Sequence, residues 1–423
     1  MRSERINKYA CLSLLIGPLL EPYNIPGTRL AIYKILMLLN VFLFFKHKGA
    51  SLFIPRYYKW FLIYAFTIPT MNALFHNYMS HLLGSYLTLM LFSANLVLLA
   101  PFVDLDRFIK YYRIFGIITC AIFFAQEISF LLYGSRFMAL IPFLDVHYEG
   151  FSTEEFSDKM SMKDRSCSCF LEPSHFAQYV LPLLAFELGS LHERNRSLAF
   201  VPIVLSIVLL ILRSGVGLLC GAALWCVFIL FSRRSLAVKT FVILPLVSIL
   251  TLVFFISYSN TEKGAAVVDR AVQLNPNNNN ELSSGIIRVY RGYMVYDTLD
   301  LPAQLLGVGV GGANDAIDNS SYNWMFEEGD HYLNNIQTLL IGYGIIGTFI
   351  FMLFLLSMIR TKSFVSVLFV VAFLSTSLLE SYFGAYRMLL FLGIPFVISS
   401  HFYVKNEKNE TLVTKGNATS LAK

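Results

Sequence analysis

The chain has 423 residues, of which 56% are hydrophobic and only 14% are Asp, Glu, Lys or Arg. Soluble domains carry about 25% charged residues, so this composition leaves too little polar surface to face water and excludes an ordinary soluble globular protein. The formal net charge is +6, and the placement of the cations, described below, argues against nucleic acid as a partner.

Apolar runs near the roughly 20 residues that cross a bilayer predict an all-α integral membrane protein with about 12 transmembrane helices. In chain order the predicted spans are 10–20, 29–45, 59–75, 82–101, 114–133, 174–191, 197–212, 215–231, 238–258, 335–359, 364–380 and 387–404. The first run is short, and if it does not span, the N-terminus lies on the other side of the membrane. The resulting regions are N-terminal membrane helices (1–133), a first long outer loop (134–173), central membrane helices (174–258), a large outer catalytic loop (259–334), C-terminal membrane helices (335–404) and a cytoplasmic tail (405–423).

The distribution of charge sets the predicted orientation. With the N-terminus in the cytoplasm, the inner segments hold 21 of the 33 Lys and Arg residues and 6 of the 27 acidic residues. The two long outer loops hold 8 cations and 17 acids. An excess of Lys and Arg near the cytoplasmic ends of spans is the positive-inside pattern. We therefore expect both termini in the cytoplasm, with the cations serving as anchors.

The two outer loops are too long to be simple connections. The larger one contains the polar run 275–280 (Asn-Pro-Asn-Asn-Asn-Asn), which will not pack into a core. After it, 285–299 is predicted to form a short amphipathic helix with Ile286, Val289, Tyr290 and Tyr293 on one side. A glycine-rich run follows, but it lacks the preceding strand and the Lys-Ser/Thr pair of a P-loop.

Three outer arginines are candidate functional residues. Arg213, followed by Ser-Gly, separates two apolar spans at the outer boundary, where a charge is costly. Arg288 and Arg291 lie three residues apart in the large loop, so both could face one side of a helical turn. A guanidinium pairs bidentately with phosphate. The alternatives are an Arg213 that snorkels to lipid phosphates and loop arginines that form internal salt bridges.

Two further residues are candidates for proton transfer. His331 stands just before the span 335–359, and histidine exchanges protons near neutral pH; the alternative is an exposed or capping loop histidine. Glu172 lies in the outer segment 170–177 (Phe-Leu-Glu-Pro-Ser-His-Phe-Ala), where the Pro-Ser pair also makes an acceptable helix start. The 6 cysteines form no metal-ligand set, and no metal or cofactor is expected. Charged residues inside or at the ends of other spans could line a transport path, but most fall near an interface: Lys34, Glu127, Glu187, Glu380 and Arg387.

These motifs together resemble those of the bacterial O-antigen and capsule polymerases and of their relatives, the O-antigen ligases. The resemblance rests on 213–215 (Arg-Ser-Gly) between two spans, on 307–309 (Gly-Val-Gly), and on 331–335 (His-Tyr-Leu-Asn-Asn) leading into 339–347 (Leu-Leu-Ile-Gly-Tyr-Gly-Ile-Ile-Gly). The phrase 171–174 (Leu-Glu-Pro-Ser) looks more like the polymerases than the ligases.

The resemblance implies a metal-independent membrane glycosyltransferase. It would join polyprenyl-diphosphate-linked oligosaccharide units into O-antigen, capsule or exopolysaccharide at the outer face of a bacterial cytoplasmic membrane, with a flippase and a chain-length regulator as partners. It further implies that Arg213 and either Arg288 or Arg291 hold the diphosphate, with Arg288 preferred because it follows a Ser-Ser-Gly run, and that His331 or Glu172 accepts the acceptor proton.

Two other functions compete with the polymerase. An O-antigen ligase would attach finished glycan to a lipid acceptor. A transporter or flippase of lipid-linked glycan belongs to another class and needs a hydrophilic path through the membrane. We predict that the spans lack polar residues at mid-depth, and that absence disfavours the transporter.

Overall fold

The computed structural model describes residues 2–28, 30–47, 54–76, 82–141, 143–146, 165–194, 200–231, 284–326, 331–359 and 363–400. This part of the chain is almost entirely helical, which confirms the expected all-α class. Within it, the strands are β1 (Tyr23–Asn24) and β2 (Asp145–Val146), a two-residue antiparallel pair. The pair joins the segment that follows the helix 105–133 to the segment that follows the first helix.

The helices follow the predicted apolar runs. In chain order they are α1 (Arg2–Leu20), α2 (Ile32–Phe45), α3 (Arg56–His76), α4 (Leu82–Leu99), η1 (Ala100–Phe102), α5 (Leu105–Tyr133), α7 (Pro173–Arg194), α8 (Phe200–Ile211), α9 (Gly215–Phe231), α12 (Ser284–Thr298), α13 (Leu301–Leu306), α14 (Ala313–Asp318), η2 (Asn323–Met325), α15 (Asn335–Ile359), α16 (Phe364–Ser377) and a last helix Tyr386–Ser400.

Three of these helical stretches are long and apolar enough to cross a membrane: Leu82–Phe102, Leu105–Tyr133 and Asn335–Ile359. Five more helices are apolar but shorter, namely α2, α8, α9, α16 and Tyr386–Ser400. The transmembrane class is therefore supported, whereas the predicted count of twelve spans is not confirmed. The predicted span 238–258 lies outside the described residues.

Local sequence signals set the ends of the longest helix, α5. The Asp104 side chain accepts a hydrogen bond from the Arg107 backbone N–H at 3.3 Å, which is an N-cap. Gly134 ends the helix in the left-handed conformation with φ 71°, as a C-terminal glycine commonly does. Between these caps the residues are mostly apolar, so the helix continues without a break.

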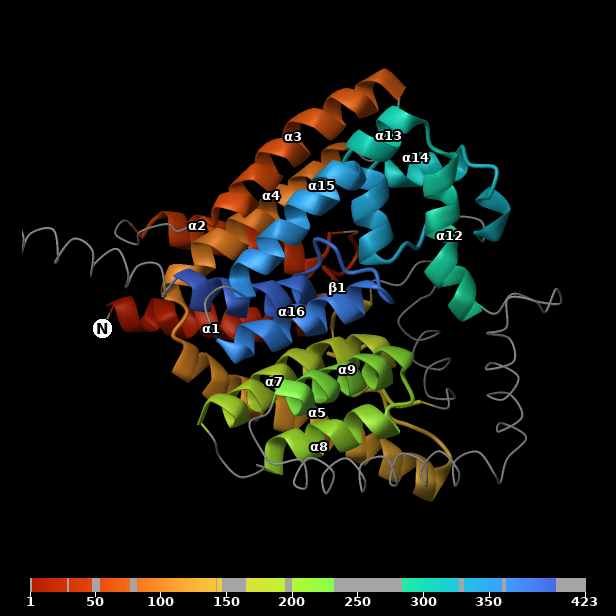
Figure 1. Cartoon of the computed structure of the whole chain (residues 1–423). Coiled ribbons are helices and arrows are strands. Elements are labelled where there is room, and N and C mark those ends of the chain that lie inside the picture. The colour runs from red at the N-terminus through yellow and green to blue at the C-terminus, as the bar shows by residue number, and fades with distance from the viewer. Residues whose placement is uncertain are drawn as a thin grey trace, which may run out of the picture.

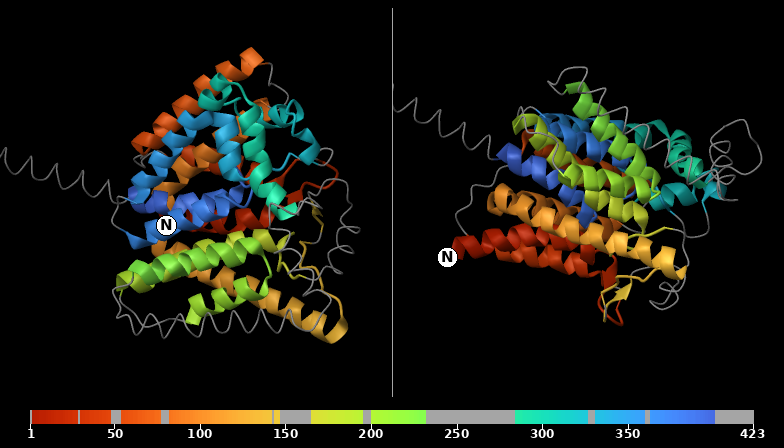
Figure 2. Two further views of the ribbon diagram at one scale, coloured as in Figure 1. Left: turned by 45° about the vertical axis from the view of Figure 1, so that its right-hand side comes forward. Right: turned by 90° about the horizontal axis from the view of Figure 1, so that it is seen from below.

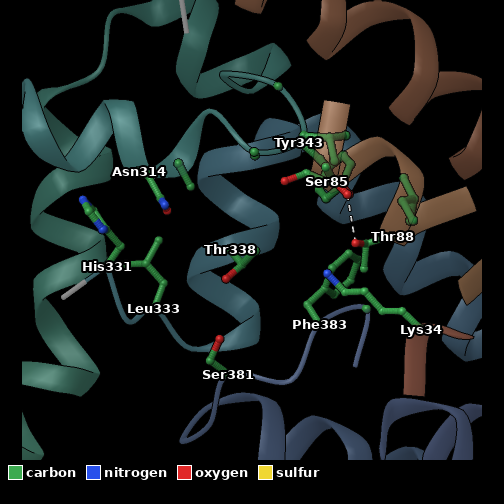
Figure 3. Close-up of a pocket in the computed structure, with 18 residues that line it drawn as sticks. Lys34, Ser85, Thr88, Asn314, His331, Leu333, Thr338, Tyr343, Ser381 and Phe383 are labelled. Carbon is green, nitrogen blue, oxygen red and sulfur yellow. Dashed lines mark hydrogen bonds between the residues drawn. The ribbon is translucent and has the colours of Figure 1, made fainter. Parts of the chain in front are cut away.

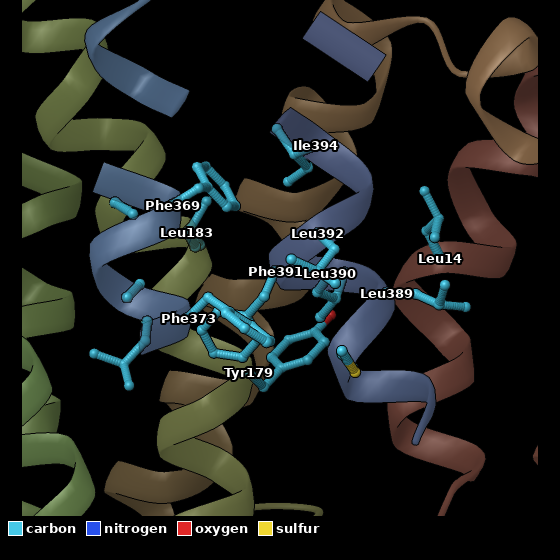
Figure 4. Packing of buried hydrophobic residues seen from close by; sticks show 14 of the residues in the cluster. Leu14, Tyr179, Leu183, Phe369, Phe373, Leu389, Leu390, Phe391, Leu392 and Ile394 are labelled. Carbon is cyan, nitrogen blue, oxygen red and sulfur yellow. The ribbon is translucent and has the colours of Figure 1, made fainter. Parts of the chain in front are cut away.

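The long helices lie side by side in one bundle (Figures 1 and 2), with α12, α13 and α14 at one end and the N-terminus at the opposite end. Helix α7 packs against α9 and α16, and α15 packs against α3. Figure 4 shows the core between α7, α16 and the last helix, where Tyr179, Phe373 and Phe391 are fully buried. This packing fixes the helix ends that carry the candidate site.

Two glycine motifs that are separate in the sequence cross each other in the structure. Helix α15 is interrupted at Gly344, which has φ 66° and ψ −177°. The carbonyls of Ile341 and Gly342, freed from the helical pattern by this break, accept hydrogen bonds from the N–H groups of Val308 at 2.9 Å and Gly309 at 3.1 Å. The run 307–309 therefore lies directly against α15.

We expect Gly307→Ala to destabilise the protein strongly. Gly307 has φ 87°, and a methyl group there would overlap the carbonyl oxygen of Gly342 and the backbone of Tyr343. A residue held in an unfavourable backbone region costs on the order of 1–3 kcal/mol, and overpacking adds a further 1–3 kcal/mol or so. The measurement is the thermal unfolding midpoint of the purified protein in detergent.

Gly134→Ala is the matched control for this substitution. Gly134 also has a positive φ of 71°, but a methyl group there would have no neighbour within 4 Å. The control therefore carries the backbone cost without the steric cost. Equal midpoints for the two variants would show that the crossing between 307–309 and α15 does not contribute to stability.

The interior of the bundle contains a hydrogen-bonded polar cluster with Asn40 and Asn95 inside predicted spans, so the prediction that the spans lack polar residues at mid-depth is wrong. The side-chain nitrogen of Asn40 lies 2.9 Å from Ser13 Oγ, 2.9 Å from Asn95 Oδ1 and 3.1 Å from the Tyr386 hydroxyl. All four residues are buried. Hydropathy averages hide single carboxamides among leucines. Since these groups pair with one another, they act as contacts between helices.

Helix α12 forms where a helix is predicted, but it buries a different face. Tyr290, predicted on the apolar side, is 59% exposed, whereas Arg291, Gly292 and Val295 are buried. The Gln337 side-chain N–H of α15 donates to the Val289 carbonyl at 2.6 Å, and a side chain at Gly292 would overlap Gln337. The helix therefore turns its glycine toward α15, because only glycine allows this close approach.

Candidate functional site

A cavity of about 530 Å³ lies at the end of the bundle that carries α14. Its walls come from the first turns of α2 and α4, the glycine run, α14, the segment around the start of α15 and the loop after α16. The lining residues with polar side chains are Lys34, Ser85, Thr88, Asn314, His331, Thr338, Tyr343 and Ser381 (Figure 3). We call this the main cavity. Hydroxyl, amide, amino and imidazole groups around one space suit a polar ligand.

His331 is the one predicted site residue that the described lining of the main cavity contains. Its Nε2 atom lies 2.8 Å from Oδ1 of Asp318, the last residue of α14. If Nε2 carries the proton and donates it to the carboxylate, Nδ1 keeps its lone pair and can accept a proton. The pair therefore has the arrangement of a general base held in place by a carboxylate.

Lys34 supplies a positive charge to the same cavity. It lies in the first turn of α2, and its amino group points toward the middle of the main cavity (Figure 3). Within the described chain it forms no ion pair with an acidic residue. From the sequence alone, Lys34 was expected near a membrane interface. A signal was present, because Lys34 is the single charged residue of the apolar run 32–45.

The segment that carries His331 is fixed to the loop after α16. The Tyr332 hydroxyl donates to the Glu380 side chain at 3.0 Å, and the Asn335 backbone N–H donates to the Glu380 carbonyl at 3.0 Å. The side-chain amide of Asn334 donates to the Leu378 carbonyl at 3.0 Å. These contacts hold two walls of the main cavity together, so the position of His331 depends on both segments.

Arg291 holds the same segment from the side of α12. Its Nε and Nη2 groups both donate to the Tyr332 carbonyl, at 3.1 and 2.6 Å, and its guanidinium lies 4.2 Å from the centre of the Phe326 ring. Only 3% of Arg291 is exposed. These contacts point to a structural contribution beside the predicted diphosphate contact.

We expect Arg291→Ala to lower the thermal unfolding midpoint of the purified protein. The substitution leaves the Tyr332 carbonyl without these two donors, and hydrogen bonds to charged groups are worth about 1.5–3 kcal/mol. Tyr290→Ala, at the exposed neighbouring position of α12, is the control and should change the midpoint little. An unchanged midpoint for Arg291→Ala, with weaker substrate binding, would favour a diphosphate contact instead.

The other predicted site residues lie outside the described lining of the main cavity. Arg213 is exposed in the turn between α8 and α9, with φ 53°, and its carbonyl accepts a hydrogen bond from Arg165 at 3.3 Å. Glu172 immediately precedes α7 and accepts a hydrogen bond from the Ser174 hydroxyl at 3.2 Å, so it takes part in the helix start. Arg288 belongs to α12, but its side chain is not among the described ones.

Comparisons with known proteins add no family to this picture. No protein-family model matches the chain, and no curated protein matches it. The resemblance to the O-antigen polymerases and ligases therefore stays an expectation drawn from short motifs. The main cavity, the His331–Asp318 pair and the apolar helical fold are the features from which a function can be inferred.

Proposed function

We propose that this protein is a membrane glycosyltransferase that polymerises polyprenyl-diphosphate-linked oligosaccharide units into O-antigen, capsule or exopolysaccharide. In this proposal about twelve helices cross a bacterial cytoplasmic membrane, and both termini lie in the cytoplasm. The end of the bundle that carries the main cavity faces outward, where lipid-linked sugars are presented.

The observation that carries the proposal is the composition of the main cavity. A His–Asp pair, a lysine without an ion-pair partner in the described chain and several hydroxyl groups meet at one end of an apolar bundle. The first turns of α2, α4 and α15 all contribute to it. Alternation of the predicted spans puts these three turns on the outer side, and their meeting in one cavity supports that orientation.

The chemistry follows from these groups. A hydroxyl oxygen of the acceptor sugar attacks the anomeric carbon of the donor, and the bond from that carbon to the diphosphate oxygen breaks. The hydroxyl proton passes to His331, and the bonding electrons leave with the diphosphate. A cation beside the departing diphosphate stabilises its charge in a site of low dielectric constant. Lys34 is the cation that the main cavity provides for this role. Arg213 and Arg288 are the other proposed contacts of the diphosphate.

The experiment that tests the proposal is a gel of surface and lipid-linked glycans from a strain that lacks the gene. We expect the ladder of polymer lengths to collapse to single repeat units and to return when the wild-type gene is restored. Arg213→Ala and Arg288→Ala copies test the diphosphate contacts. If both variants leave polymer length and yield unchanged, the arginines do not hold the diphosphate.

Two other outcomes of this gel would overturn the polymerase. Loss of all surface glycan, with long lipid-linked chains accumulating, would identify a ligase. An unchanged ladder would exclude both glycosyltransferase functions for the glycan assayed and would leave a transporter, or a polymer other than the one assayed. The paired state of the buried polar cluster around Asn40 disfavours a transporter, because its polar groups contact one another.

A further inference from the structure

A second cavity, of about 210 Å³, lies next to a buried ion pair between the N-terminal and C-terminal parts of the chain. The Arg387 Nε and Nη2 atoms both lie 2.9 Å from Glu21 Oε1, and the Arg387 backbone N–H donates to Oε2 at 3.1 Å. Both side chains are largely buried, at 7% and 13% exposure. We call this the Arg387 cavity; Pro18, Glu21, Tyr33, Phe170, His175 and Arg387 are among its lining residues.

Three polar side chains of the Arg387 cavity keep hydrogen-bonding capacity that the described protein does not use. The Nη1 atom of Arg387 is buried and has no partner among the described residues. The side chains of Tyr33 and His175, which also line the cavity, form no hydrogen bond with the described part of the chain. An unsatisfied buried donor costs about 1–3 kcal/mol, so a bound acceptor in this cavity would stabilise the site.

The chemistry of the walls selects a neutral, ring-shaped ligand with hydroxyl groups. Glu21 already balances the charge of Arg387, so no net positive charge is left to attract an anion. The half-buried Tyr33 offers an aromatic ring, which suits the C–H face of a sugar, and Arg387, Tyr33 and His175 offer polar groups for its hydroxyls. The volume is far above the ~10–15 Å³ that one water molecule requires.

At two places in the sequence, a residue that lines the Arg387 cavity is close to a residue that lines the main cavity. Tyr33 lines the Arg387 cavity and Lys34 lines the main cavity. Likewise Gly384 lines the main cavity, and Arg387, three residues later, lines the other. The same two segments of the chain therefore contribute residues to both cavities.

We propose that the Arg387 cavity is a sugar-binding subsite that holds an uncharged pyranose residue of the acceptor glycan. The acceptor role of this sugar rests on the proposed function, whereas the binding of a sugar in the Arg387 cavity does not. Arg387, His175 and Tyr33 are specificity residues, and His331 in the main cavity receives the proton from the acceptor hydroxyl.

The test uses membranes of the deletion strain that carry the full-length protein or its variants. The probe is the lipid-linked oligosaccharide fraction that the same strain accumulates. We expect Tyr33→Phe and His175→Gln each to raise the KM for added acceptor about three- to tenfold, the equivalent of one hydrogen bond. The kcat value should change less than twofold. Tyr86→Phe is the matched control, since the Tyr86 hydroxyl is also buried and has no hydrogen-bond partner among the described residues, but Tyr86 is not among the described lining residues of either cavity.

A binding measurement separates failure of this inference from failure of the proposed function. The probe is the oligosaccharide released from the same fraction by mild acid, and saturation-transfer NMR follows its binding to the purified full chain. Binding that both variants weaken, and that a tenfold rise in salt leaves unchanged, supports an uncharged sugar site even if the strain shows no polymerase. Absent binding, or equal binding in wild type and variants, overturns the inference even if His331→Ala abolishes the ladder.

Discussion

Replacing His331 by alanine is expected to stop elongation and leave single repeat units on the carrier lipid. His331 is the general base in the proposed reaction, and such assistance is typically worth 10²–10⁴-fold in rate. A polymer of many units requires many successive transfers, so a rate loss of this size would remove the ladder from a gel. The measurement is the rate of incorporation of lipid-linked units by membranes, with the glycan gel as the cellular readout.

Asp318→Asn separates the base from the residue that positions it. The amide can still meet His331 Nε2 at 2.8 Å, but it loses the negative charge that stabilises the protonated ring. We expect a smaller loss than for His331→Ala. His331→Ala and Asp318→Asn together should lose no more than His331→Ala alone, because Asp318 acts through His331. A double variant much slower than the single His331→Ala variant would give Asp318 a separate role.

Replacing Lys34 by methionine is expected to weaken the reaction about 10- to 100-fold. Methionine keeps an unbranched apolar stem and removes the charge, so the bundle should fold. The lost contact is a charge-assisted hydrogen bond to the diphosphate, worth about 1.5–3 kcal/mol, and each 1.4 kcal/mol is about tenfold. Lys34→Arg keeps the charge and should retain more activity. The measurement is kcat/KM for the lipid-linked donor in membranes.

Lys46→Met provides the control within the same helix. Lys46 follows the last residue of α2, at the helix end opposite Lys34, and it lines no part of the main cavity. We expect it to retain nearly all activity. If Lys34→Met is as active as Lys46→Met while Arg213→Ala is inactive, the diphosphate binds near the turn between α8 and α9, and the main cavity holds only the acceptor.

The helical class of this protein could be predicted from local patterns in the sequence. Helices need only local apolar runs and caps such as Asp104 and Gly134, so the predicted spans coincide with helices wherever the structure describes them. Both glycine motifs were recognised in the sequence, but their contact was not. The contact depends on the break in α15 at Gly344, which only the folded structure shows, with the run 307–309 packed against it.

The different environments of Arg291 and Lys34 could not be predicted from the sequence. Both were visible as cations near apolar segments, where a charge is costly and requires either a partner or a function. Packing distinguishes them: Arg291 donates both described hydrogen bonds to the Tyr332 carbonyl, whereas Lys34 extends into a cavity. The buried Asn40 cluster was missed for a related reason, since the partners of its carboxamide lie on other helices.

The sequence by itself determined that the chain is helical, with apolar segments suited to a membrane and a histidine just before one of them. Composition and hydropathy suffice for these conclusions, because they depend on the free energy of single segments in lipid or water. Only the tertiary structure decided which side chains share a cavity: Lys34, His331 and Ser381 meet there from opposite ends of the chain. A cavity is a property of packed helix ends, and no average along one segment contains it.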